Sequence, residues 1–197
     1  MRTRNTEKEQ LVKEKTVELI VKDGFEGFSI NKLAKLCGIS VATLYIYYKS
    51  KDDLLIQVAT EYITHWNALM QEGLNEQLSF DDGMKLLWKN RVAFYRSVPD
   101  GLQFFEQMRN SSYHLEVFAP MMKDFKNAMS AFLQNAQKNN ELIDKLTPEI
   151  FFTIAFAPLH NLFRFDYTGK GIGNTPFKLT DKIIWRTFEL VMRSLKK

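Results

Sequence analysis

The sequence contains one cysteine, five prolines and no long apolar run, and each of these scarcities excludes a class of protein. A single thiol, that of Cys37, cannot form an intrachain disulfide, which suits a reducing cytoplasm. No apolar run approaches the roughly 20 residues that a helix needs to cross a bilayer. Residues 1–10 are polar and charged, unlike a signal peptide. We therefore expect a soluble, cytoplasmic protein without a membrane partner.

Signals for catalysis or metal binding are equally scarce. The three histidines, His65, His114 and His160, have no second histidine or cysteine at metal-ligand spacing. No nucleophile elbow, phosphate loop or dinucleotide fingerprint occurs, and the glycines of residues 169–173 follow a predicted helix, which is typical of a flexible linker. The sequence predicts no catalytic residue, no metal and no cofactor, and it leaves an enzyme as the less favoured alternative.

What the chain does have is enough apolar sequence for a packed core, together with a modest positive charge. Its 197 residues are 45% apolar and 25% charged, the balance of a globular protein rather than a disordered one. The net charge of +4 is compatible with a nucleic-acid partner but does not indicate one by itself. That indication comes from the spacing of residues 24–55.

Almost every segment has helical periodicity, and no alternating strand pattern is sustained. Thr6 and Ser50 each begin a capping-box spacing, Gly24 would end the first helix, and Pro120 suits the first position of a later one. Asp100-Gly101 is typical of a turn between helices. We predict an all-α protein of about nine helices, near residues 6–23, 30–37, 40–48, 50–73, 79–98, 102–109, 120–132, 148–165 and 180–195.

Residues 29–48 fit a helix-turn-helix. Two short helices meet across Gly38, which tolerates the positive φ of the turn, and Ala34 is small enough for the helices to approach closely. Ser40 can cap the second helix, which places Val41 and Ala42 near its N-terminal end. That end is the part that such motifs insert into the major groove of DNA.

Five segments of this sequence are Gly24-Phe25, Phe28-Ser29-Ile30, Leu33-Ala34, Gly38-Ile39-Ser40 and Thr43-Leu-Tyr-Ile-Tyr-Tyr-Lys-Ser-Lys-Asp-Asp-Leu-Leu55. Together they resemble the DNA-binding head of the tetracycline-repressor (TetR) family of transcriptional regulators. The similarity extends over about residues 7–56, and its last string is highly specific. The resemblance implies a DNA-binding domain over residues 1–50 and a helical effector-binding and dimerisation domain over residues 51–197. It further implies a homodimeric regulator, usually a repressor, that binds a palindromic operator.

The resemblance also implies which side chains contact DNA, and these are Ser29, Asn31, Ser40, Val41, Ala42, Thr43, Tyr45, Tyr47, Lys49 and Lys51. Hydroxyl and ammonium groups in this set can bind phosphate oxygens, and a helix N-terminus at residue 51 would add to that attraction. Asn31 can pair bidentately with adenine, whereas Val41 and Ala42 can meet thymine methyl groups. Arg2 and Arg4 are expected to form a loose basic arm.

Residues 150–165 are apolar on several faces of their predicted helix, so the helix needs more than one covering layer. The family forms its dimer from its last two long helices, which implies that a second subunit supplies one layer; a core helix of a monomer is the alternative. Pro158 should kink this helix or leave a carbonyl unpaired. The expected interface residues are Phe151, Leu159, Leu162, Phe163, Ile184, Phe188 and Val191.

An effector site is expected among aromatic and methionine side chains of the body, namely Tyr95, Phe104, Phe105, Met108, Met122, Phe125, Phe152, Phe156 and His160. Such side chains line adaptable apolar pockets, although the same spacing also suits a packed core. The expected effector is small and apolar or aromatic, and it would shift the protein away from its DNA-binding conformation. The helix that starts at Ser50 would transmit that change. A helical binding or interaction protein without a DNA-binding role is the other alternative.

Overall fold

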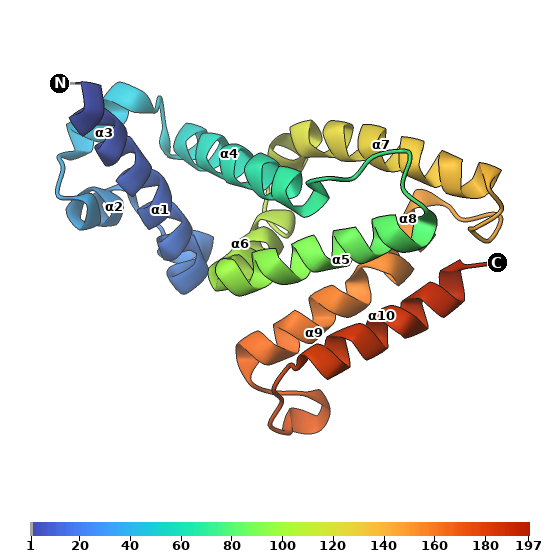
Figure 1. The fold of residues 1–197 in the computed structure, drawn as a ribbon. Helices are drawn as coiled ribbons and strands as arrows, with labels where there is room; N and C mark the ends of the chain where they lie inside the picture. Colours follow the sequence, from blue (N-terminus) through green and yellow to red (C-terminus); the bar gives the residue numbers. More distant parts are fainter. Residues whose placement is uncertain (1) are drawn as a thin grey trace. The chain divides into compact units, whose positions relative to one another are not determined.

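The computed structural model describes residues 2–197, apart from the side chains of residues 2–6 and 124. Figure 1 shows its helices in chain order. Their bounds are α1 Arg2–Gly27, α2 Ile30–Cys37, α3 Val41–Tyr47, α4 Lys51–Gln71, α5 Phe80–Ser97, α6 Pro99–Arg109, α7 His114–Lys138, α8 Pro148–Ala155, α9 Ala157–Thr168, the 3-10 helix η1 Ile172–Asn174 and α10 Asp181–Leu195. Within the described residues there are eleven helices and no strand, so the all-α prediction is confirmed.

The helices belong to two compact units. The first unit comprises the chain up to Asn67 together with Asp100–Lys123, and the second comprises Ala68–Pro99 together with Asp124–Lys197. Helices α4 and α7 each begin in the first unit and end in the second. These units follow the packing of the chain, whereas the predicted boundary at residue 50 separates functions and stays a prediction.

Helix α1 begins earlier than the capping box at Thr6 predicts. It starts at Arg2, so the backbone at Arg2 and Arg4 is helical rather than a loose arm, while their side chains lie outside the described ones. Residues 2–5 include no glycine or proline, so a helix can extend through them at little cost. At the other end, Gly24 has non-helical angles (φ 68°, ψ −179°), which confirms it as the predicted interruption, and a short turn follows to Gly27.

In the first unit, residues from far along the sequence pack against the N-terminal helices α1–α3, which we call the head, and against α4. The ring of Trp66 on α4 meets that of Phe104 on α6 edge to face, with centroids 5.8 Å apart. Tyr113, between α6 and α7, donates its hydroxyl to the carboxylate of Asp52 at 2.6 Å. Its ring lies 5.6 Å from that of Phe25. The head is therefore part of a larger packed body than its own three helices.

Helix α6 begins three residues before the predicted start at Leu102. Asp100 and Gly101, which we expected in a turn between helices, lie in its first turn. Pro99 at the first helical position and an acidic residue beside it are both favourable at a helix N-terminus, and these preferences outweigh the turn signal of the Asp-Gly pair.

Helix α7 also starts before its predicted first residue, Pro120, which instead lies inside the helix. A turn at Ser111 nucleates it, because the carbonyl of Ser111 accepts the N–H of His114 at 3.3 Å. Proline in a helix removes the bond to the carbonyl four residues earlier, here that of Glu116. Glu116 is exposed, so water can bind that carbonyl and the helix continues.

Helix α5 begins as predicted and packs closely against α7 in the second unit. The hydroxyl of Ser79 accepts the N–H of Asp82 at 3.1 Å. The rings of Phe80 and Phe132 stack with centroids 5.8 Å apart. A Cβ atom at Gly83 would lie 2.2 Å from the ring of Phe132, so this close approach requires glycine.

The single helix predicted over residues 148–165 is in fact two helices. Thr147 caps α8 by accepting the N–H of Ile150. Helix α8 ends at Ala155 and α9 begins at Ala157, because Phe156 is not helical (φ −125°, ψ −29°). Pro158 has no N–H to donate to the carbonyl of Ile154. The carbonyl of Ala155 instead accepts the indole N–H of Trp88 at 2.9 Å.

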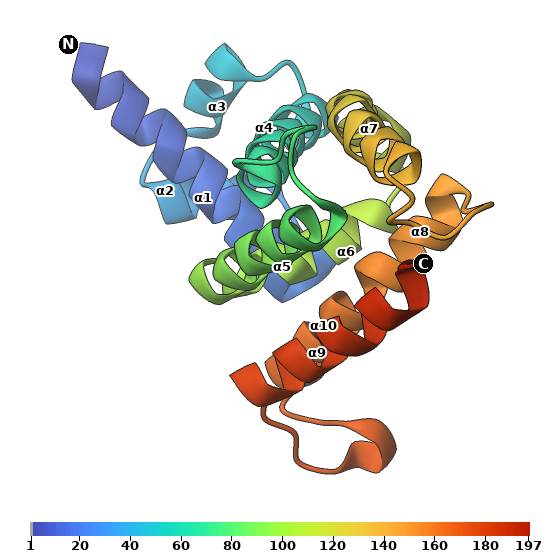
Figure 2. The same ribbon diagram turned by 45° about the vertical axis from the view of Figure 1, so that its right-hand side comes forward.

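Helices α9 and α10 lie side by side in the second unit (Figures 1 and 2). Gly169 ends α9 in the left-handed region (φ 66°), and η1 with an isolated bridge between Lys170 and Pro176 orders the loop that follows. Thr180 caps α10 by accepting the N–H of Ile183. None of the helices in the described part of the chain is both long enough and apolar enough to cross a membrane.

Candidate nucleic-acid interface and effector region

The turn between α2 and α3 has the geometry predicted for a helix-turn-helix. Gly38 adopts a left-handed conformation (φ 63°, ψ 32°), which residues with a Cβ rarely adopt. Its N–H lies 3.3 Å from the carbonyl of Lys35, and the N–H of Ile39 lies 3.1 Å from that of Ala34. These bonds close α2 and redirect the chain into α3.

Apolar side chains hold the three helices of the head together. The buried ones are Val12, Val17, Leu19, Ile20, Phe28, Leu33, Ala34, Cys37 and Leu44. Helix α2 packs against both α1 and α3. Cys37 is buried, with Sγ 3.9 Å from the carbonyl oxygen of Leu11, and burial raises the pKa of its thiol. It is a packing residue rather than a nucleophile.

Most of α3 is left uncovered by the head. Leu44 is buried, whereas Tyr45 is 50% exposed and Ile46 is 77% exposed. Ala42 and Tyr47 are exposed as well. Ile46 was absent from the predicted set, although its position two residues after Leu44, on the opposite side of the helix, could have identified it. The exposed residues of α3 thus include two tyrosines beside the apolar Ala42 and Ile46.

The predicted serines act first as helix caps. Ser29 Oγ accepts the N–H of Lys32 at 3.2 Å, and Ser40 Oγ accepts that of Thr43 at 3.1 Å. The hydroxyls of Ser40 and Thr43 are also hydrogen-bonded to each other at 2.8 Å. A hydroxyl that accepts a backbone N–H keeps its own proton, so Ser29 and one member of the Ser40–Thr43 pair can still donate to phosphate. Asn31, in the first turn of α2, is exposed.

The start of α4 is closed by the predicted capping box. Ser50 Oγ accepts the N–H of Asp53 at 3.1 Å, and the carboxylate of Asp53 accepts the N–H of Lys49 at 2.7 Å. A hydrogen bond from Gln57, followed by the one from Lys49, lowers the pKa of Asp53. The box fixes where α4 begins, directly after α3.

Lys51 is tied back to the head. Its Nζ donates to the carbonyl of Phe28 at 3.1 Å and lies 5.5 Å from the centre of the same residue's ring. An ammonium group has three donors, so this bond leaves others for a phosphate. Lys51 therefore has a structural role beside its predicted contact with DNA, while Lys49 is exposed.

Four of the predicted effector residues lie in the first unit. Phe104 and Met108 are completely buried, and Phe105 is half-buried with its ring edge to face against Phe118 at 4.8 Å. Met122 is half exposed. The two buried side chains contribute to the core of this unit.

The other five lie in the second unit, where the structure brings them into two clusters. The rings of Tyr95 and His160 are 6.2 Å apart. Phe152 contacts both Phe125, at 5.8 Å, and Phe156, at 5.4 Å. Phe156 is buried, while Phe152 is 43% exposed, so this second cluster reaches from the interior to the surface.

Arg91 on α5 was missed by the sequence analysis and is the only arginine among the buried residues described. Its Nη1 donates to the carbonyls of Leu87 and Met70 at 3.1 and 3.3 Å. Its guanidinium lies 3.9 Å from the centre of the Phe156 ring. Burial lowers the pKa of Arg91 to about 10, so it is charged at neutral pH. Its spacing of four residues from Leu87, within an apolar stripe, was the available signal.

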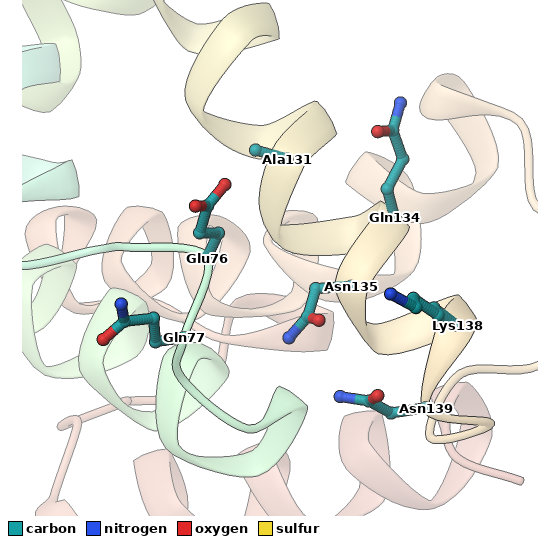
Figure 3. Close-up of a pocket in the computed structure, with 7 residues that line it drawn as sticks. All are labelled: Glu76, Gln77, Ala131, Gln134, Asn135, Lys138 and Asn139. Carbon is teal, nitrogen blue, oxygen red and sulfur yellow. The ribbon is translucent and has the colours of Figure 1, made fainter.

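A hollow of about 560 Å³ lies between the α4–α5 loop and α7. Figure 3 shows Glu76 and Gln77 on the loop and the other lining residues on α7. Its lining is Glu76, Gln77, Ala131, Gln134, Asn135, Lys138 and Asn139. This polar surface contains none of the predicted effector residues. Across the described residues, no three histidine, cysteine, aspartate or glutamate side chains are grouped in a way that could hold a metal.

The predicted dimer residues are mostly buried within the chain itself, namely Phe151, Leu159, Phe163, Ile184 and Val191. Leu162 and Phe188 are half-buried. Leu190, on the outer side of α10, is 51% exposed and was not predicted. The buried side chains pack α8, α9 and α10 together, and the others remain accessible.

Comparison with known proteins agrees with this geometry. Residues 8–58 match the model of the bacterial regulatory proteins of the tetR family. An uncharacterized HTH-type transcriptional regulator of Haemophilus influenzae is 28% identical over 163 residues, which cover 82% of this chain and 84% of that protein. The fatty acid metabolism regulator protein of Bacillus subtilis is 22% identical over 146 residues, which cover 73% of this chain and 75% of that protein.

Solved structures show the same fold. A TetR family transcription regulator from Marinobacter aquaeolei has a TM-score of 0.84 at 22% identity, with both chains fully covered. A TetR-family regulator from Haemophilus influenzae has a TM-score of 0.78 at 25% identity, covering 98% of this chain and 99% of that one. FadR of Bacillus subtilis, in complex with stearoyl-CoA, has a TM-score of 0.73 at 17% identity, covering 93% and 97%. These proteins are transcriptional regulators, and the match over residues 8–58 together with the shared fold supports a TetR family transcriptional regulator.

Proposed function

We propose that this protein is a homodimeric transcriptional repressor of the cytoplasm that binds a palindromic operator through α3 and leaves it when a small apolar effector binds. The observation that carries the DNA-binding role is the uncovered side of α3. Leu44 fixes the helix to the head, while Ala42, Tyr45 and Ile46 remain exposed. Apolar groups on such a helix can meet thymine methyl groups in the major groove.

Support for a dimer comes from the outer surface of α9 and α10. Leu190 is half exposed, and Leu162 and Phe188 are only partly covered by the chain itself. Apolar side chains in such positions are typical of a surface that a second copy covers. Two copies would present two α3 helices, which fits half-sites about one helical turn of DNA apart, roughly 34–36 Å.

Support for an apolar effector comes from the aromatic cluster of Phe125, Phe152 and Phe156 in the second unit. Two comparisons with Bacillus subtilis agree with this: the curated relative is a fatty acid metabolism regulator protein, and the solved structure is FadR in complex with stearoyl-CoA. An effector with a hydrocarbon body would suit these rings. It would act by binding more tightly to the conformation that does not fit the operator.

We propose that helix α4 transmits the conformational change from the effector site to the head. Its capping box begins immediately after α3, and the helix continues without interruption from the first unit into the second. A shift of its second-unit end can therefore alter the position of the head. The hydrogen bond from Tyr113 to Asp52 fixes the first turn of α4 to the segment that precedes α7.

The DNA-binding proposal can be tested by mobility shift on the DNA upstream of the protein's own gene, at two salt concentrations. Ala42→Asp places a negative charge on the exposed side of α3 and should weaken binding by more than about 100-fold, because it repels phosphate. Ala93→Asp makes the same change at an exposed position of α5 and should bind like the unaltered protein. Equal affinities of the two variants would contradict DNA recognition by α3.

The dimer can be tested by sedimentation equilibrium of the full chain. Leu190→Lys should shift the protein toward monomer, whereas Leu115→Lys, at an exposed position of the first unit, should not. A monomeric unaltered protein, or a dimer that Leu190→Lys leaves intact, would contradict the α9–α10 interface.

A further inference from the structure

Among the described residues, Arg91 is buried and has no carboxylate partner. It is 5% exposed, and the titratable group that interacts with its charge is the phenol of Tyr95. Buried arginines are ordinarily paired, since removing a charge from water is costly. The carbonyls of Leu87 and Met70 provide only part of that compensation, and both bind Nη1.

The remaining donors of this guanidinium form one edge. Nη1 makes both hydrogen bonds, which leaves Nε and Nη2 without a hydrogen-bond partner in the part of the chain that the structure describes. Nε and Nη2 point in the same direction, and their spacing matches the two oxygens of a carboxylate. The face of the group is already covered by the ring of Phe156 at 3.9 Å, so the free edge is the part that can still bind a ligand.

A row of aromatic rings leads from the surface to this arginine. Phe152 is 43% exposed and contacts Phe125 on one side and buried Phe156 on the other. Phe156 in turn lies under the guanidinium. A ligand whose hydrocarbon part lies beside these rings would therefore have one end close to the guanidinium of Arg91. Phe156 holds this place because it occupies the break between α8 and α9.

We propose that the effector is an apolar monocarboxylic acid whose carboxylate binds the Nε–Nη2 edge of Arg91 while its hydrocarbon body lies along Phe156, Phe152 and Phe125. This rests on the proposed function in that the ligand is the effector, and it adds the chemistry of the ligand's polar end. A charged, bidentate pair shielded from water is among the strongest hydrogen-bonded contacts in proteins. An alcohol or an ester of the same length lacks the charge that Arg91 requires.

The test uses the full-length protein and a fluorescent polyunsaturated fatty acid, cis-parinaric acid, with its methyl ester as the uncharged probe. The unaltered protein should bind the acid at least about tenfold more tightly than the ester, a ratio equivalent to about 1.4 kcal/mol. This comparison needs no substitution, so it holds even if a variant fails to fold. Equal affinities for acid and ester, or no binding of the acid, would overturn the proposal.

Substitutions then assign the charge to Arg91. Arg91→Met should weaken binding of the acid at least about tenfold and leave the ester unchanged, whereas Arg91→Lys, which keeps the charge but loses the fork, should fall between. Arg96→Met, at an exposed arginine of the same helix, is the matched control and should bind both probes normally. A folded Arg91→Met protein that binds the acid as tightly as the unaltered one would overturn the assignment.

Operator binding separates this inference from the proposed function. The acid should release the unaltered protein from DNA, while Arg91→Met should bind DNA but resist release. If stearoyl-CoA releases the protein and the free acid does not, the repressor role stands and the carboxylate proposal fails. If the protein does not bind DNA at all but still binds the acid through Arg91, the proposed function fails and the site stands.

Discussion

The indole N–H of Trp88 on α5 donates a hydrogen bond of 2.9 Å to the carbonyl of Ala155, the last residue of α8. A continuous helix would have paired that carbonyl with the N–H of Leu159. Trp88 is completely buried, so the bond forms away from water and satisfies a group that would otherwise be unpaired. The side chain of Trp88 thus stabilises the interruption between α8 and α9.

Replacing Trp88 by phenylalanine should therefore destabilise the protein. Trp88→Phe leaves the buried Ala155 carbonyl unpaired and removes packed volume, which together should cost roughly 2–4 kcal/mol in the free energy of unfolding. Trp185→Phe makes the same change at a half-buried ring and should cost about 1 kcal/mol or less. Urea unfolding followed by circular dichroism measures both, and equal costs would show that the Ala155 bond contributes nothing.

The hydrogen bond between Tyr113 and Asp52 should raise the pH at which the phenol of Tyr113 ionises. The hydrogen bond to the Asp52 carboxylate, followed by burial and the carboxylate's charge, raises the pKa of Tyr113 to about 12, against an ordinary value near 10. Because the folded state holds the proton more tightly, this contribution to stability is complete below about pH 10 and is lost as the pH rises through 12. Subtracting the ultraviolet titration of Tyr113→Phe from that of the unaltered protein should isolate a single phenol that ionises near pH 12. A difference curve centred near pH 10 would contradict the bond.

Asn31 and Lys51 should affect DNA binding in different ways. Asn31→Ala should change the preferred sequence, with about 1–3 kcal/mol less discrimination at one base pair. Lys51→Ala should weaken binding to all sequences and reduce the salt dependence by about one counterion. Because Lys51 also bonds the carbonyl of Phe28, its loss should lower the stability of the head as well. An unchanged salt dependence would show that Lys51 acts only within the protein.

The single thiol, that of Cys37, should react slowly with thiol reagents in the native state. Cys37 is buried against the carbonyl of Leu11, and burial raises its pKa, so little thiolate is present or accessible at neutral pH. Labelling with a chromogenic disulfide reagent should be at least about tenfold slower in buffer than in urea, with Cys37→Ala as the blank. Equal rates would mean that the packing between α1 and α2 opens readily.

Local capping signals predicted the fold most accurately. The predicted caps at Ser40 and Ser50 begin helices in the structure, because a side-chain oxygen three residues before a free N–H is a purely local relation. The starts of α6 and α7 were misplaced because the Asp-Gly pair and Pro120 each had two possible interpretations. The start of α1 was misplaced because the helix extends through residues 2–5, ahead of the capping-box spacing at Thr6.

The site was predictable where its residues are consecutive. The string from Ser40 to Lys51 places one helix and one turn, so its exposed side follows from the sequence. Arg91 and Phe156 are 65 positions apart in the sequence. Their contact depends on the interruption between α8 and α9, which Pro158 predicts only in part. No periodicity links an arginine on one helix to a ring in the interruption of another.

The first unit is built from two separate stretches of chain, up to Asn67 and Asp100–Lys123. Two non-covalent contacts join those stretches. The side chain of Gln107 donates a hydrogen bond to the carbonyl of Val21, and the ring of Trp66 packs against that of Phe104. A protease that cuts the exposed residues 75–77 would therefore yield two polypeptides on a denaturing gel but one particle in native solution. Conversely, a fragment that ends at residue 50 would lack the side chains that cover α1 and should be prone to aggregation.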